Sequence, residues 1–517
     1  MQIGLSLSLT AQLRLSTSAY VVSGFEPALV FDFKNSYYRK GEESTVFASA
    51  ITHAASTNAT MVDSDGLLKW RPHNTLSYSE DLTNSNWVKQ VSATVDLNVA
   101  AAPDGSMTAS RLTFGGSFSN LRQIGAAVTG ATATTKVWIK LESGNANLAF
   151  GISAAQFDIL NVTSEWVEYS TTDTEVASNG KGFLLQDRNS SGFGSVLIWH
   201  PHSFRSDLGG MVNNPDASTG LESYVPTTSV AVYAPRRGHH IYNGSAWVDE
   251  GILHESEART NLLLNSGTLS TQSATVANVA NTLSFTGTGT VTLSGVSTAG
   301  PLVGTGTGEN NRVSLTFTPT AGTLTLTVSG TVTNAQLEQG ATPSSYIPTG
   351  SATVTRAAET LTVPAANLPY DSTNMSIQMD GKMTYADTGS EFNVTQYRWQ
   401  SSGTNYIQAR VRTHGTRTGQ PFFAQRQSTS GYDEVTGGDS TYSPDTNVPF
   451  NIASRHGTTF INGAHESTLL TANTTPTILP ALSTTDLNLG STFMGTIGQF
   501  RMWDEDITDA GIAEAST

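Results

Sequence analysis

Hydrophobic positions recur with a period of two residues along most of the chain. Residues 323–328 alternate threonine with leucine or valine, and residues 3–9 alternate similarly near the N-terminus. Such alternation is typical of β-strands that bury one face. Turn residues separate these short runs, and a convincing helical pattern occurs only at residues 508–515. The pattern predicts an all-β protein, a string of antiparallel β-sandwich (jelly-roll) domains.

Two segments of the chain begin and end with similar sequences. The first opens HNTLSYS at residues 73–79 and closes LESYVPT at residues 221–227. The second opens RTNLLLNS at residues 259–266 and closes SYIPT at residues 345–349. Shared sequences at both ends predict two copies of one module, the second of them shorter.

The expected domains follow from these boundaries. We expect an N-terminal region with β-strands (1–72), a first β-sandwich module (73–234) and a connector (235–258) with a short hairpin at residues 242–244. A second, shorter module (259–357) and a third domain (358–517) complete the chain.

Composition and charge exclude several classes of protein. The 517 residues include no cysteine, which excludes disulfides, thiolate metal sites and a cysteine nucleophile. The formal net charge of −15 argues against nucleic-acid binding, which needs clustered lysine and arginine. No run approaches the roughly 18 apolar residues of a membrane-spanning helix, so we predict no membrane insertion.

Catalytic signals are poor. The chain has no G-x-S-x-G elbow and no HExxH motif. His200 and His202 could offer two metal ligands, but no third ligand stands near them. The acidic run at residues 504–506 fits a solvated turn better than a glycosidase carboxylate pair. We therefore predict that the protein is not an enzyme and has no catalytic or metal site.

The repeated segments resemble modules of fibre and spike proteins from tailed phages or prophage-like particles. The resemblance rests on the RTNLL opening, the APDG turn at residues 102–105, the QLEQG segment at 336–340 and the SYIPT close. Residues 354–359 (VTRAAE) follow that close, as is usual in such proteins. The resemblance implies carbohydrate-binding-like β-sandwiches.

The third domain resembles a concanavalin-like (laminin-G-like) jelly roll. Residues 495–503 carry a G-x-I-x₅-W strand, and a helix start follows at residues 507–509. We expect no cofactor, although such domains often bind Ca²⁺ through oxygen ligands. The conceivable ligands are Asp371, Asn374, Asp380 and Asp504.

Sugar binding needs exposed aromatic rings beside polar groups. Trp138 and Trp199 lie in apolar strands and are predicted to be core residues. Trp87 sits in a polar loop, although the resembled modules often bury this tryptophan. The candidate ligand-binding residues are aromatic residues among polar neighbours: Trp87, Tyr78, Tyr397, Trp399, Tyr406 and Tyr432.

The resemblance implies a phage virion fibre or spike that attaches to the host. The N-terminal region would anchor it to other virion structural proteins, and the distal domain would bind host cell-surface polysaccharide. A homotrimer on the particle surface is expected from fibre families. The alternatives are a purely architectural capsid decoration or tail component without ligand and, with less support, a glycan-degrading spike.

Overall fold

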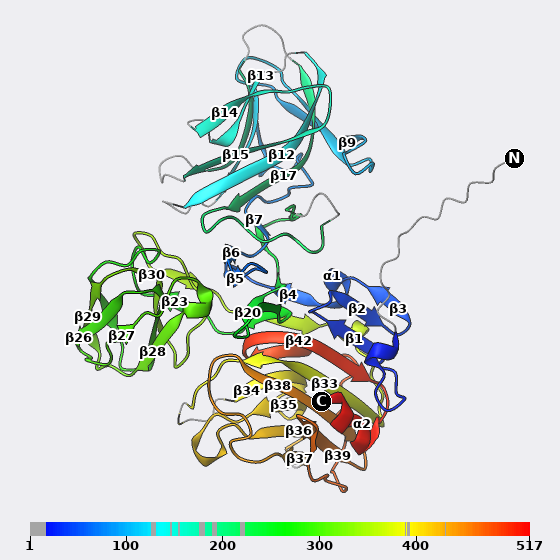
Figure 1. Cartoon of the computed structure of the whole chain (residues 1–517). Coiled ribbons are helices and arrows are strands. Elements are labelled where there is room, and N and C mark those ends of the chain that lie inside the picture. Colours follow the sequence, from blue (N-terminus) through cyan, green and yellow to red (C-terminus); the bar gives the residue numbers. More distant parts are fainter. Residues whose placement is uncertain are drawn as a thin grey trace, which may run out of the picture. The chain divides into compact units, whose positions relative to one another are not determined.

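The computed structural model confirms the all-β prediction, with 50% of residues in strands and 5% in helices. It describes residues 17–517 except 126–130, 145–146, 154–155, 175–180, 189–193, 218–222, 388, 390–392 and 430, so the alternation at residues 3–9 lies outside the described residues. The chain forms two compact units, whose strands and helices are labelled in Figure 1. Unit 1 comprises residues 1–52 and 361–517, and unit 2 comprises residues 53–360. No helix in the described part of the chain is long and apolar enough to span a membrane.

Unit 1 is a sandwich of two antiparallel sheets. The first sheet contains, in order, β3 (Glu43–Thr45), β2 (Tyr37–Lys40), β1 (Leu29–Asp32), β42 (Met494–Trp503), β33 (Asn374–Met383), β38 (Val448–Gly457), β39 (Ile461–His465) and β40 (Thr468–Leu469). The second sheet contains, in order, β37 (Gly431–Thr436), β36 (Pro421–Gln427), β35 (Asn405–Val411), β34 (Val394–Ser402), β41 (Leu487–Thr492) and β32 (Thr360–Val363). The hydroxyl of Tyr397 on β34 bonds that of Ser454 on β38, so the two sheets face each other.

Short helices complete this unit. The predicted C-terminal helix is confirmed as α2 (Thr508–Ala515), whose Ile512 and Ala515 pack on Trp503 of β42. The other helices are α1 (Phe47–Ala50) and the 3₁₀ turns η1 (Thr17–Tyr20), η3 (Ala365–Asn367) and η4 (Gly415–Arg417). Strand β4 (Thr52–Ala54) stands where the chain passes into unit 2.

Residues near the N-terminus fold with the C-terminal residues. Strand β1 lies between β2 and β42, and all four of its residues are buried. Three of its four residues, Leu29, Val30 and Phe31, are apolar, which explains this position, because a strand covered on both faces needs mainly apolar side chains. The expected separate region at residues 1–72 is therefore corrected for the residues from Tyr20 to Thr45, which belong to the jelly roll.

Unit 2 contains two β-sandwiches, which we call module 1 and module 2. Module 1 has one sheet with β15 (Val167–Thr174), β12 (Thr132–Ser143), β17 (Ser195–Arg205), β10 (Ala109–Thr113) and β9 (Thr94–Ala100), and a second with β14 (Gln156–Asn161), β13 (Asn147–Ser153), β16 (Lys181–Asp187), β11 (Asn120–Gly125) and β8 (Val88–Gln90). Module 2 has β24 (Gln272–Val276), β29 (Gly322–Ser329), β26 (Thr290–Gly295) and β27 (Leu302–Val303) in one sheet, β28 (Val313–Phe317), β25 (Asn281–Gly287) and β30 (Val332–Gln339) in the other, and the turn η2 (Glu309–Asn311).

Five short strand pairs flank the modules. They are β5 (Thr60–Val62) with β6 (Leu68–Trp70), β7 (His73–Asn74) with β18 (Val232–Tyr233), β19 (Arg236–Arg237) with β22 (Ile252–Glu255), β20 (His240–Tyr242) with β21 (Trp247–Asp249), and β23 (Arg259–Asn261) with β31 (Val354–Arg356). The pair β20–β21 is the hairpin predicted in the connector.

A buried asparagine holds the opening of module 1 to its close. The side-chain amide of Asn74 donates to the carbonyl oxygens of Val225, at 2.9 Å, and Pro201. Its oxygen accepts the backbone N–H groups of Leu76 and Ser203. One side chain thus satisfies four backbone groups where three segments meet.

Module 2 repeats this arrangement with Asn261. Its amide donates to the carbonyl oxygens of Ile347 and Ala335, both at 2.9 Å, and its oxygen accepts the N–H groups of Leu263 and Leu337. The repeated sequence noted at the two openings therefore corresponds to a repeated set of hydrogen bonds. We call this set the asparagine clamp.

A serine–tyrosine bond accompanies each clamp. The hydroxyls of Ser79 and Tyr224 lie 2.8 Å apart in module 1, and those of Ser266 and Tyr346 lie 2.7 Å apart in module 2. All four side chains are buried. The pairing explains why both opening segments end in a serine and both closing segments carry a tyrosine.

Five buried charged residues join segments that flank the two modules. Glu359 pairs with Arg71 and, at 2.7 Å, with Arg236, while Glu255 pairs with Arg236 at 2.7 Å and Arg356 at 3.1 Å. Although burial raises the pKa of Glu255, Arg356 and Arg236 lower it to about 2. The pKa of Glu359, which burial also raises, is held well below its usual value by Arg236 and Arg71, so both carboxyl groups remain charged in the folded protein at neutral pH. We call this set the buried charge cluster.

Candidate functional site

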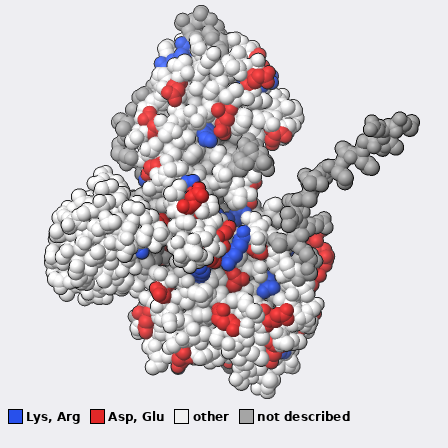
Figure 2. Space-filling model, in the orientation of Figure 1, with Lys and Arg blue, Asp and Glu red and all other residues white. Residues whose placement is uncertain are grey.

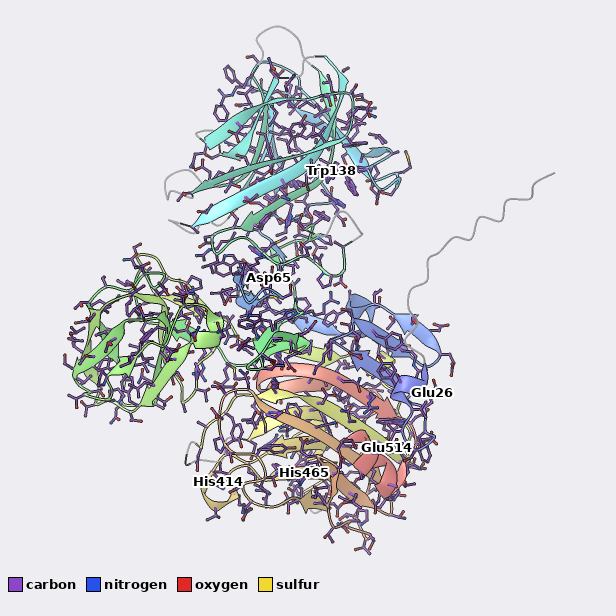
Figure 3. All side chains as sticks on the ribbon, in the orientation of Figure 1. Glu26, Asp65, Trp138, His414, His465 and Glu514 are labelled. Atoms are coloured by element: carbon purple, nitrogen blue, oxygen red, sulfur yellow. The ribbon has the colours of Figure 1, made fainter. Side chains whose placement is uncertain are left out.

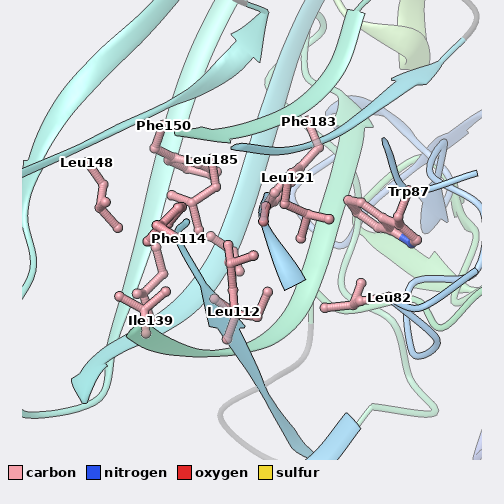
Figure 4. Close-up of a cluster of buried hydrophobic side chains, with 14 of the residues drawn as sticks. Leu82, Trp87, Leu112, Phe114, Leu121, Ile139, Leu148, Phe150, Phe183 and Leu185 are labelled. Atoms are coloured by element: carbon pink, nitrogen blue, oxygen red, sulfur yellow. The ribbon is translucent and has the colours of Figure 1, made fainter. Parts of the chain in front are cut away.

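Trp87 belongs to the core of module 1. Its side chain is 1% exposed and meets the ring of Phe183 edge-on at 5.2 Å (Figure 4). Its indole nitrogen donates to the carbonyl of Tyr78, which is itself half-buried against the same core. A sugar cannot stack on Trp87, so the expectation of an exposed ring there is corrected.

Two further candidates lie between the sheets of unit 1. Tyr397 and Trp399 on β34 are fully buried, and the indole of Trp399 donates to the carbonyl of Thr485. These expectations are corrected for the same reason, because alternation along β34 turns both rings into the sandwich.

Tyr406 and Tyr432 lie on the opposite, outer face of the same sheet. Tyr406 pairs with Arg426 across β35 and β36, and Arg426 pairs with Tyr432 across β36 and β37. Tyr432 is 44% exposed, whereas Tyr406 is 6% exposed. Of the six aromatic candidates, these two occupy one surface.

Arginines surround these tyrosines on the outer face. Arg398 lies between inward-facing neighbours on β34 and stacks over Tyr406, with its guanidinium carbon 4.9 Å from the ring centre. Arg426 lies 5.8 Å from the ring centre of Tyr432. Arg410 stands on the same side of β35 as Tyr406. We call these five residues the arginine–tyrosine face: Arg398, Tyr406, Arg410, Arg426 and Tyr432.

One carboxylate on this side of the sheet is already paired. Arg412 bonds Glu434 at 2.8 Å, and the hydroxyl of Tyr432 also donates to that carboxylate. Arg426 bonds the carbonyl oxygens of Ser428 and Thr429. Glu434 is therefore not available to neutralise the remaining arginines.

Arg398 and Arg410 have no carboxylate partner among the described residues. The Nε atoms of both are buried without a hydrogen-bond partner in that part of the chain, as is Oε1 of Gln408, which pairs with Arg398 across β34 and β35. Burial and the neighbouring charge of Arg398 lower the pKa of Arg410 to about 10. Both guanidinium groups therefore stay charged at neutral pH and repel each other.

This arrangement suits an anionic ligand with a ring. A guanidinium group donates two parallel hydrogen bonds to a carboxylate, and a second cation nearby strengthens the attraction. Exposed tyrosine adds a flat apolar surface with a polar edge. The net positive face contrasts with the overall charge of −15.

These arginines were not among the residues predicted from the sequence. Each occupies an outward position on its own strand, but they become neighbours only through the register of β34, β35 and β36. The alternation within each strand was the available signal, since it places Arg398 and Arg410 on the face of the strand that is opposite to the face of their apolar neighbours.

The conceivable Ca²⁺ ligands do not converge. Asp380 lies six residues along β33 from Asn374, about 20 Å at the usual rise. The carboxylate of Asp371 accepts hydrogen bonds from the backbone of Thr373 and Asn374. No group of three or more histidine or acidic side chains is placed to hold a metal within the residues that the structure describes.

No family model and no curated protein matches the chain. Among solved structures, the botulinum neurotoxin serotype D binding domain is 14% identical over 30% of this chain and 39% of that chain (TM-score 0.25). A leech intramolecular trans-sialidase is 12% identical over 29% of this chain and 24% of that one (TM-score 0.23). The CBM40 of a Ruminococcus gnavus IT-sialidase, bound to α2,6-sialyllactose, is 8% identical over 29% and 87% (TM-score 0.24). The chain spans about two fifths of the length of the first structures it matches, so its function has to be argued from its own side chains.

Proposed function

We propose that the protein binds acidic saccharides through the arginine–tyrosine face of unit 1. The observation that carries the proposal is the presence of two neighbouring guanidinium groups, Arg398 and Arg410, without a carboxylate partner in the described structure. An unpaired cation held partly out of water is costly, and a ligand carboxylate would relieve that cost.

The residues of the arginine–tyrosine face have separate roles in binding the sugar. Arg398 and Arg410 hold the carboxylate of the sugar, and Tyr432 stacks on an adjoining ring. Glu434 keeps Arg412 and the hydroxyl of Tyr432 in place, which fixes the edge of the face. The ligand class is thus a uronic or sialic acid unit within a longer glycan.

We further propose the biological setting that the repeated motifs suggest. The chain would be a fibre or spike on a phage particle, attached to other virion proteins and binding host surface polysaccharide. Three copies in one fibre would turn weak single contacts into useful avidity through effective concentration. Sequence resemblance supports this setting, whereas the arginine–tyrosine face supports the ligand.

The test compares the full-length protein with a double variant on immobilised polysaccharides. Arg398→Gln with Arg410→Gln should weaken binding to a uronic-acid polymer at least about tenfold, since charged hydrogen bonds contribute about 1.5–3 kcal/mol each. Arg417→Gln, an exposed arginine on η4, is the matched control and should bind like the parent. Near-ultraviolet circular dichroism checks that each variant is folded.

Two results would contradict the proposal. One is unchanged binding by the double variant, which would place the ligand elsewhere. The other is failure of the parent protein to bind any acidic or neutral polysaccharide, which would favour the architectural alternative.

A further inference from the structure

A separate pocket of about 200 Å³ opens in module 1. Its walls come from the segment after β7, from β9 and β10, and from the middle of β17. Leu82 and Ile198 supply apolar lining, and Glu80, Ser110 and His200 supply polar groups. Ligand pockets for drug-sized molecules span about 300–1,000 Å³, so this one suits a smaller group.

Three polar groups of the pocket have no partner among the described residues. The carboxylate of Glu80 and the hydroxyl of Ser110 make no hydrogen bond or ion pair there, and Nδ1 of His200 is buried and unpaired. Ser110 is 4% exposed. Burial raises the pKa of Glu80. Glu80 is still accessible to solvent, but buried polar groups are usually paired in native proteins, so the unpaired Nδ1 of His200 at this pocket indicates a ligand.

His200 is held rigidly in this wall. Its ring lies between those of Trp199 and Tyr224, with centroids 3.4 Å and 3.6 Å away and planes within 17° of parallel. Its backbone has a φ of 52°, in the left-handed region that non-glycine residues seldom adopt. Such a backbone conformation persists only where the surrounding structure imposes it.

Module 2 shows that the sandwich does not require these residues. Ser203 of module 1 and Leu337 of module 2 are equivalent, because each donates its backbone N–H to the clamp asparagine. The residues three positions before them are His200 and Asn334. Asn334 has a φ of 49°, so both modules share the left-handed position. Only module 1 places an imidazole there.

The other pocket residues differ in the same way. The serine of the serine–tyrosine bond is followed by Glu80 in module 1 and by Gly267 in module 2. Trp199 of module 1 corresponds to Thr333 of module 2. The clamp is retained in both modules, whereas the carboxylate, the indole and the imidazole occur only in the first. Trp199 also packs in a small core cluster of module 1, so Glu80 and His200 are the members of this set that are available for binding.

We propose that this pocket binds one neutral pyranose ring, through hydrogen bonds from sugar hydroxyls to Glu80, Ser110 and His200. A carboxylate accepts two hydroxyl donors at once, which matches neighbouring hydroxyls on a ring. The charge of Glu80 repels acidic sugars, so the ligand differs from that of the arginine–tyrosine face. The two sites lie in different units, so each proposal can be supported or contradicted independently of the other.

The test uses the full-length protein and a panel of methyl hexopyranosides, with saturation-transfer NMR to find binders and titration to measure affinity. At least one neutral hexopyranoside should bind, and Glu80→Gln should weaken it about tenfold, as expected for loss of a charged hydrogen bond. His200→Asn, which installs the module 2 residue and tolerates the left-handed backbone, should also weaken binding.

Two controls separate this site from others. Asn334→His, the reverse exchange in module 2, and Arg398→Gln with Arg410→Gln should both leave hexopyranoside binding unchanged. Absence of any neutral binder, binding of amino sugars alone, or equal affinity in the parent, Glu80→Gln and His200→Asn proteins would overturn the proposal.

Discussion

Module 1 and module 2 share one asparagine clamp and differ in what surrounds it. In both, an asparagine satisfies four backbone groups and a serine–tyrosine bond lies beside it. Module 1 adds an indole, an imidazole and a carboxylate around a pocket, while module 2 has threonine, asparagine and glycine at those places. The comparison separates residues that the fold requires from residues available for binding.

The two modules also differ in surface chemistry. Residues 260–355 contain only Glu309, Arg312 and Glu338 as charged residues, and the lobe that carries β26–β30 is almost wholly white in Figure 2. Module 1 carries histidines at positions 73, 200 and 202, whereas residues 259–357 contain none. Module 2 is thus a sandwich with little titratable chemistry, which makes it an internal control for module 1.

The largest expected effect concerns the buried charge cluster that flanks both modules. Glu359→Gln leaves Arg71 and Arg236 without one carboxylate and should lower the free energy of unfolding by about 3–5 kcal/mol. Urea unfolding monitored by tryptophan fluorescence measures this loss, and calorimetry provides a second measurement. The exposed control Glu165→Gln should change little. A similarly small change in both variants would contradict the structural role given to the cluster.

The clamp asparagines should matter equally in the two modules. Asn74→Ala and Asn261→Ala each leave four buried backbone groups unsatisfied and should each cost about 3 kcal/mol of unfolding free energy. Differential scanning calorimetry of the two variants provides the comparison. A large loss for one and none for the other would show that the clamps are not equivalent.

Acid should destabilise module 1 before module 2. Burial lowers the pKa of His73 to about 4 and of His202 to about 3, so both are neutral in the folded protein. Their contribution to the free energy of unfolding is fully present above pH 6.5. It is lost as the pH falls toward these pKa values, because the unfolded chain then binds more protons than the folded chain. The expected loss is about 2–3 kcal/mol at pH 5.5. Hydrogen exchange at pH 7.5 and 5.5 measures this, and equal change in both modules would contradict it.

The smallest expected effect concerns the serine–tyrosine bond. Tyr224→Phe and Tyr346→Phe each remove one buried hydroxyl and should each cost about 1 kcal/mol. Equal shifts in the unfolding midpoints of the two variants would support equivalence of the modules. A larger effect of Tyr224→Phe would indicate that its contact with the ring of His200 adds to stability.

Local patterns predicted what depends on neighbouring residues. Alternation gave the strand-rich fold, the sequence at residues 508–515 predicted helix α2, and the repeated openings led to the clamp. The half-buried Trp138 (Figure 3) pairs with buried Trp199 across β12 and β17, in line with the prediction that apolar strands contribute to the core.

Features that depend on long-range packing were not predicted. Trp87 stands in a polar loop, and only its contact with Phe183, far along the chain, places it in the core. Arg398 and Arg410 become neighbours through strand register, and Glu80 and His200 line one pocket although they stand 120 positions apart in the sequence. A single sequence carries no record of such pairings, because side-chain alternation fixes a face but not its neighbours.

The most direct measurement is the affinity of the full-length protein for one acidic polysaccharide before and after chemical reduction of its carboxyl groups to alcohols. The polymer length, linkage and remaining hydroxyls stay the same, so only the partner of Arg398 and Arg410 changes. We predict that reduction weakens binding at least about tenfold, the loss expected for charged hydrogen bonds. Equal affinity for the native and reduced polymers would contradict the proposal that the arginine–tyrosine face binds acidic sugars.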